Sequence, residues 1–241
     1  MAPRPGTDYV RRVLNDIRVN NNNSDVISLL NTALARYNDS IGFIEIKKKL
    51  VKGTLLDLDQ YVQSLNSSDC IDKEDLLKIF HWKNNRGKNR PNLKQIMKND
   101  DDDVKRISKE AFIAIRRKDF KEGINMLSEL CGVGTATATS FFAIDRDNLP
   151  FMCDEVLEAI TGTREYKMSA YLVMRETLIA KGALVGMSAS DLCQALWSHA
   201  ILSENDVNYN NSTQTTVKKS RQDKGNDDEQ PQQPSKKQKS K

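Results

Sequence analysis

Apolar residues recur every three or four positions through most of residues 1–204, and this spacing limits the fold more than any other feature. The segment SDVISLLNTALARY (24–37) is typical, with a Ser at its start and apolar residues at helical spacing from Val26 to Ala33. No segment alternates convincingly with the period of two expected of a half-buried strand. Helices are expected near residues 7–19, 24–37, 40–51, 54–65, 73–83, 91–98, 104–116, 119–130, 134–144, 154–160, 165–182 and 189–203. The sequence therefore predicts one all-α domain over residues 1–204.

The segment LSELCGVGTATATSFF (127–142) predicts two helices joined by a very tight turn. Leu127 and Leu130 lie one helical turn apart on a buried face, and Gly132 and Gly134 allow backbone angles that other residues avoid. Ala138 is small enough for the two helices to approach closely. The second helix is expected to begin with free N–H groups that suit one phosphate.

This pattern, L-x-x-L-x-G-h-G-x-x-x-A-x-x-h, resembles the helix-hairpin-helix motif of the helix-hairpin-helix DNA glycosylase superfamily. The resemblance covers residues 110–160 firmly and places the hairpin at about 119–144. It implies the glycosylase helical fold and a turn that holds the DNA backbone, here Gly132, Val133, Gly134 and Thr135. The alternative is a helical hairpin that only packs or that binds protein.

A second segment, NLPFMCDEVLEAI (148–160), strengthens the resemblance. Glycosylases of this superfamily place an aspartate that supports cleavage of the N-glycosidic bond where Asp154 stands. Their bifunctional members carry a hairpin lysine at the position of Ala136, so the resemblance implies base excision without a lyase step. The alternative is that Asp154 only caps a helix. The four-cysteine cluster of many members is missing.

The segment HWKNNRGKNRPNLKQIMKN (81–99) carries six basic residues and no acidic one. Gly87 and Pro91 mark a turn, from which four basic side chains are expected to reach DNA phosphates: Lys83, Arg86, Lys88 and Arg90. Trp82 beside them is predicted either to stack on a base or to anchor the loop in the core. Two alternatives stay open for the basic residues, namely pairing with Asp100–Asp103 and Asp154–Glu155, or simple solvation.

The chain also resembles a eukaryotic group that shares three segments with it. These are the Trp-Lys-x-x-Arg-Gly-Lys-x-Arg-Pro segment, the glycosylase-like hairpin, and a Pro-Phe-x-x-Asp-Glu segment, present here from Pro150 to Glu155. That resemblance implies no particular activity.

The remaining composition bears on location and partners. Residues 205–241 are polar, with eight basic against five acidic residues, and are expected to form a disordered tail that suits an import receptor. No apolar run is long enough to span a bilayer, so no membrane partner is expected, and the location is predicted as nuclear or otherwise cytoplasmic. A solvated tail without a receptor is the alternative.

Metal and cofactor sites are not expected. The four cysteines (Cys70, Cys131, Cys153, Cys193) form no Cys-x-x-Cys pair and are interpreted as reduced core residues. Asp100–Asp103 are interpreted as the cap of the next helix, and His199 as part of a half-buried helix face near Trp197. The sequence thus predicts a DNA-binding protein resembling these glycosylases, or a non-catalytic protein-binding scaffold with the same fold.

Overall fold

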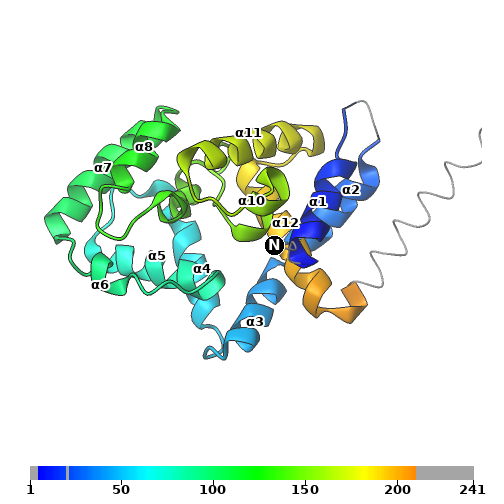
Figure 1. The fold of residues 1–241 in the computed structure, drawn as a ribbon, viewed down its shortest axis with the longest axis horizontal. Coiled ribbons are helices and arrows are strands. Elements are labelled where there is room, and N and C mark those ends of the chain that lie inside the picture. The colour runs from blue at the N-terminus through cyan, green and yellow to red at the C-terminus, as the bar shows by residue number, and fades with distance from the viewer. Residues whose placement is uncertain (1–4, 20–21, 210–241) are drawn as a thin grey trace, which may run out of the picture.

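The computed structural model describes residues 5–19 and 22–209 and contains, within them, α-helices and two short 3-10 helices but no strand (Figure 1). The prediction of an all-α chain is confirmed. The α-helices are α1 (Pro5–Asp16), α2 (Ser24–Ala35), α3 (Tyr37–Lys48), α4 (Thr54–Gln63), α5 (Lys73–Arg86), α6 (Leu93–Ile96), α7 (Asp101–Arg116), α8 (Phe120–Leu127), α9 (Thr135–Ala138), α10 (Asp154–Thr161), α11 (Met168–Val185) and α12 (Ala189–Asn205). The 3-10 helices are η1 (Ser64–Ser67) and η2 (Thr139–Asp145).

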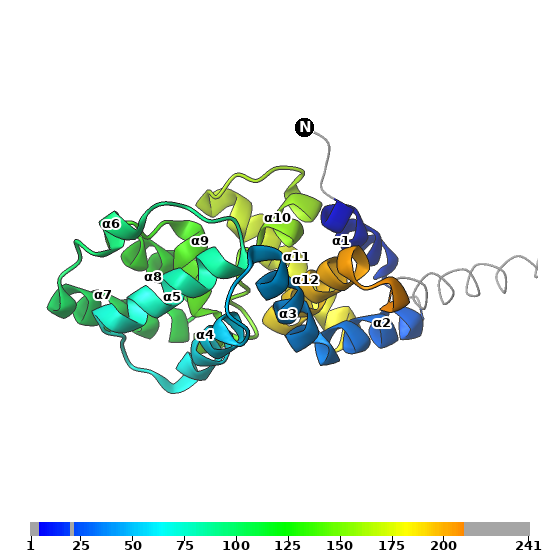
Figure 2. The same cartoon turned by 90° about the horizontal axis from the view of Figure 1, so that it is seen from below.

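The helices form two lobes that differ in where their residues come from along the chain (Figures 1 and 2). The terminal lobe combines α1–α3 with α10–α12, and α12 runs through it in contact with α1, α2, α3 and α11. The middle lobe holds α4–α9 with η1 and η2, and its far end is the pair α7 and α8. Helix α3 packs on both α4 and α5, so it joins the lobes.

One apolar core continues through both lobes. The largest wholly buried side chains include Trp82, Phe112 and Phe141 of the middle lobe and Tyr171 and Trp197 of the terminal lobe. The two lobes are therefore joined by packed apolar side chains as well as by the chain itself.

The run of four aspartates begins α7, as the sequence predicts. Asp100 is the N-cap, and its carboxylate accepts the backbone N–H of Asp102 at 2.9 Å. Asp101 accepts the backbone N–H of Lys73 at 2.9 Å and so ties α7 to the start of α5. These contacts give Asp100 and Asp101 a structural role at the start of α7.

The folded part extends past the predicted boundary at residue 204. Asp206 pairs with Arg36 at 2.7 Å, and the buried Tyr209 hydroxyl lies 2.8 Å from Nδ1 of His199. His199 is buried rather than half-buried, and this burial lowers its pKa to about 4. The rest of the predicted tail and its import signal lie outside the described residues.

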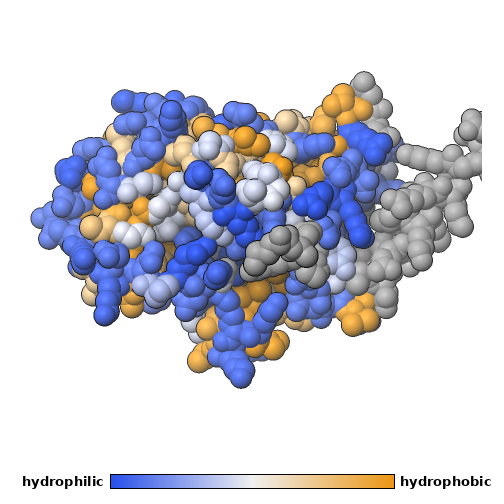
Figure 3. Space-filling model, viewed as in Figure 1, coloured by the Kyte–Doolittle hydropathy of each residue, from blue (hydrophilic) through white to orange (hydrophobic). Residues whose placement is uncertain are grey.

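The surface is mainly hydrophilic on the face shown in Figure 3. Large exposed apolar side chains are few and include Ile46 and Val51 next to the end of α3. None of the helices described is both long and apolar enough to cross a membrane. Cys153 and Cys193 are core residues as predicted, whereas Cys70 and Cys131 are exposed, which corrects the prediction for those two.

Candidate functional site

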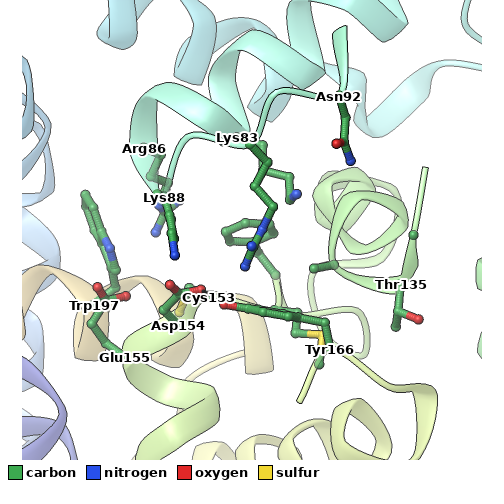
Figure 4. A pocket seen from close by; sticks show the side chains of 16 residues that line it. Lys83, Arg86, Lys88, Asn92, Thr135, Cys153, Asp154, Glu155, Tyr166 and Trp197 are labelled. Carbon is green, nitrogen blue, oxygen red and sulfur yellow. Dashed lines mark hydrogen bonds between the residues drawn. The ribbon is translucent and has the colours of Figure 1, made fainter. Parts of the chain in front are cut away.

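A cavity of about 180 Å³ lies where the two lobes meet (Figure 4). The middle lobe contributes the loop after α5 and the hairpin turn before α9. The terminal lobe contributes the start of α10, Tyr166 and Trp197. Three features that lie apart in the sequence thus line one cavity. They are the basic segment, the hairpin turn and Asp154.

The backbone of the basic loop accepts hydrogen bonds from a lysine of α3. Lys48 Nζ donates to the carbonyl of Asn84 at 2.6 Å and to the carbonyl of Gly87, where α5 ends. The Asn84 side chain also bonds both backbone groups of Arg90, at 3.3 and 3.4 Å. These hydrogen bonds fix the backbone of the loop at several points.

The four predicted phosphate-binding cations have different environments. Lys88 is exposed at the rim, and Figure 4 shows its side chain directed toward the cavity. Arg90 is half-buried, with its guanidinium 4.9 Å from the centre of the Tyr166 ring. Lys83 is also half-buried; burial lowers the pKa of its amine, and the nearby Arg90 lowers it further.

Arg86 differs from the other three because its side chain is only 2% exposed. Its guanidinium lies 4.0 Å from the ring centre of Trp197 and 5.3 Å from that of Phe151, both of which line the cavity. Nη1 donates to the Tyr37 hydroxyl at 2.8 Å. The prediction that Arg86 projects from the loop is therefore wrong, although Arg86 still lines the cavity.

Trp82 anchors the loop in the core and does not stack on a base. It is wholly buried, and its indole N–H donates to Asp59 Oδ1 at 2.8 Å. The same carboxylate accepts the Tyr37 hydroxyl at 2.9 Å and the amide of Gln63 at 2.6 Å, and Oδ1 lies 4.0 Å from Nη1 of Arg86. Of the two predicted roles for Trp82, the structure supports the anchor.

The hairpin turn has the predicted packing but a shorter second helix. Val133 and Ala138 are buried, and Gly132 has φ +79° with the side chain of Gln95 beside it. The expected helix over 134–144 is only four residues of α9 followed by the 3-10 helix η2. So short a helix has little dipole, and the backbone N–H groups of Thr137 and Ala138 bond the Gly134 carbonyl.

Two of the four predicted hairpin contacts reach the cavity. Gly134 is exposed and Thr135 half-buried, and both line it, whereas Gly132 packs against α6 and the Val133 side chain lies in the core. Gly134 has ordinary extended angles, φ −107° and ψ 177°, and a Cβ there would meet nothing within 4 Å. The turn therefore offers an open surface rather than a preformed phosphate site.

Asp154 is directed toward the cavity rather than used as a cap. Cys153 is the N-cap of α10, and Asp154 is the first helical residue. Asp154 Oδ1 accepts the Tyr166 hydroxyl at 2.7 Å, and burial together with this carboxylate raises the pKa of Tyr166 to about 12. Ala136, for which the resemblance implies the position of the lysine in bifunctional members, lines the same cavity as Asp154.

The chain matches no protein-family model, no curated protein and no solved structure. Function must therefore be argued from the cavity itself. Within the described residues no three His, Cys, Asp or Glu side chains gather as metal ligands would. Three residues that orient or enclose the predicted ones were not predicted from the sequence as site residues: Tyr166, Trp197 and Asp59.

Proposed function

We propose that this chain is a DNA-binding protein of the helix-hairpin-helix glycosylase type. The observation that carries the proposal is the meeting of the basic loop, the hairpin turn and Asp154 at one cavity. Lys83, Lys88 and Arg90 supply the positive charge that attracts a phosphate backbone, and Gly134 leaves the turn open for close approach. A nuclear location, with the tail recognised by an import receptor, belongs to the same proposal.

Excision of a base is the second candidate, and the position of Asp154 favours it. The carboxylate is held by Tyr166 at the cavity instead of capping α10. In such a reaction it would stabilise positive charge on the sugar or orient a water molecule, with Tyr166 fixing its direction. With Ala136 in the hairpin, no Schiff base forms at that position, so the reaction would be monofunctional.

Two substitutions at Gly134 test DNA binding. Because a side chain there meets open space and needs no unusual backbone angle, Gly134→Glu and Gly134→Lys should both fold normally. The interaction energy between a unit charge and a phosphate about 4 Å away is about 1 kcal/mol in bulk water and about 4 kcal/mol near a protein surface. We therefore expect Glu to weaken binding about tenfold or more, and Lys to leave it unchanged or tighter.

The assay measures binding of the full chain to duplex DNA with an abasic-site analogue, and to the undamaged duplex, across a salt series. A form that ends after Tyr209 keeps the Asp206 and Tyr209 contacts while removing the tail. If removing the tail abolishes DNA binding, and Gly134→Glu and Gly134→Lys leave the affinity unchanged, the cavity face is not a DNA site. The scaffold alternative would then hold.

A further inference from the structure

Arg86 is a buried cation whose N–H groups are mostly unused. Its charge is stabilised by four aromatic rings, those of Trp197, Trp82, Phe151 and Tyr37, at 4.0–5.5 Å from the guanidinium carbon. Among the described residues its guanidinium makes one hydrogen bond, from Nη1 to Tyr37, and its Nε is covered and has no partner. A guanidinium carries five N–H donors, and since Nε is covered, the donors open to a ligand in the cavity are those of Nη2, which is neither covered nor hydrogen-bonded to a described residue.

The nearby carboxylate does not use these donors. Asp59 already accepts hydrogen bonds from Tyr37, Trp82 and Gln63, and its closest approach to Arg86 is 4.0 Å. An oxyanion in the cavity that Arg86 lines would give the Nη2 donors a charge-assisted acceptor.

The charge of the cavity wall indicates which oxyanion. The lining residues include four cations, Lys83, Arg86, Lys88 and Arg90, against the two carboxylates Asp154 and Glu155. A terminal phosphate monoester carries about −1.5 to −2 charges at pH 7, whereas an internal backbone phosphate carries about −1. The monoester therefore balances the excess of positive charge more closely.

The burial of Arg86 also favours a terminal phosphate over an internal one. An internal phosphodiester has a strand on both sides and stays at the duplex surface, where it meets Lys88 at the rim. Arg86 is 2% exposed, and a group with a free end meets less steric hindrance in approaching it than a phosphate with a strand on both sides.

We infer that the cavity binds a terminal phosphate monoester, with Arg86 as the inner donor and Lys83 and Lys88 as its outer partners. The inference rests on the proposed function only in taking a DNA strand end as the source of the phosphate. A free nucleotide presents the same chemistry. No covalent step is involved.

The test pairs a direct readout of Arg86 with matched DNA. The full chain is titrated with a gapped duplex whose 5′ end at the gap carries a phosphate or a hydroxyl, and with the 3′-phosphate equivalent. Inorganic phosphate and a deoxynucleoside 5′-monophosphate are separate arms, each against sodium chloride of equal ionic strength. The Nε–H resonance of Arg86, assigned by its loss in Arg86→Lys, reports on the guanidinium in the intact protein.

We expect a preference of about tenfold or more for a phosphate end over the hydroxyl end, with a shift of the Arg86 resonance. Lys88→Met should reduce this preference. Lys94→Met is the matched control, because Lys94 is exposed in the same basic segment but does not line the cavity, so it should weaken both duplexes equally.

Equal affinity for phosphate and hydroxyl ends with an unmoved Arg86 resonance in every arm would overturn the inference, even if Gly134→Glu still weakens DNA binding. A shift of Arg86 with phosphate or the monophosphate, in a protein that binds no DNA, would support the phosphate site and refute DNA as its source.

Discussion

Replacing Asp59 by Ala should destabilise the protein by about 4 kcal/mol. The carboxylate is 1% exposed and is the acceptor for Tyr37, Trp82 and Gln63. Without it, the Trp82 indole N–H loses its acceptor inside the core, and Arg86 loses its counter-charge. Removing one member of a buried ion pair costs about 3–5 kcal/mol, and the expected loss of about 4 kcal/mol lies within that range.

The expected change is large enough to measure without loss of the fold. One kcal/mol shifts Tm by about 2–4 °C in a domain of this size, so Asp59→Ala should lower Tm by roughly 8–16 °C. Urea unfolding can be followed by tryptophan fluorescence, since the two tryptophans, Trp82 and Trp197, both contact Arg86. The denaturant slope should stay the same if only the stability changes.

Two controls separate the buried network from ordinary effects of losing a carboxylate. Asp57→Ala removes an exposed carboxylate from the same helix and should cost less than about 1 kcal/mol. The double variant Asp59→Leu, Arg86→Met replaces the whole charge pair with apolar groups and should be less destabilised than the sum of the single changes. Equal effects at Asp57 and Asp59, or strict additivity in the double variant, would refute the reasoning.

Four further predictions concern single sites. Gly42→Ala in α3 should stabilise the protein by about 0.5–1 kcal/mol because its Cβ meets nothing within 4 Å, as thermal unfolding would reveal. Gly123→Ala should destabilise it by about 1–3 kcal/mol in the same measurement, because its Cβ would lie 2.6 Å from an Ile115 side-chain atom. His199 has its pKa lowered from 6.5 to about 4 by burial, so the unfolded chain binds the proton first and about 3 kcal/mol of stability should be lost as pH falls from 6.5 to 4. His199→Gln should flatten that part of the stability profile measured in urea, and an unchanged slope would contradict the assignment. Asp154→Asn should abolish any base release from damaged duplexes while DNA binding stays intact or becomes stronger; release that continues would exclude Asp154 from the chemistry.

The helices were predictable because their signals are local. Helical spacing, the caps at Asp72 and Asp100, and the glycines of the hairpin lie within a few residues of what they specify. One exception is the helix expected over 91–98, of which only Leu93–Ile96 is α-helical. Another is the helix expected over 134–144. Its residues Phe141 and Phe142 are both buried, and φ −84° with ψ 26° at Phe141 departs from helical geometry. Tertiary packing outweighs local preference there.

The candidate site was predictable only in part, because burial is not a local property. The basic segment identified the loop, but which of its cations stays exposed depends on α3, α4 and α12, which lie far away in sequence. One signal was available: Asp59 stands between Leu55 and Val62 at helical spacing, and all three are buried. An acid within an apolar stripe needs a buried partner, and here its partners include Trp82 and Arg86.

The aromatic surroundings of Arg86 link the fold to the proposed binding of a phosphate. If Arg86 were satisfied by Asp59 alone, the loop would be a structural feature and its exposed lysines would bind anions without selectivity. Instead, aromatic rings stabilise the charge while most N–H donors stay unused. Burial also lowers the local dielectric around the guanidinium, so each hydrogen bond to an anion would be stronger there than in water. Selectivity for a phosphate end should therefore depend on Arg86 together with Lys83 and Lys88, whereas overall affinity for DNA should depend on salt and on exposed basic residues outside the cavity, such as Lys94.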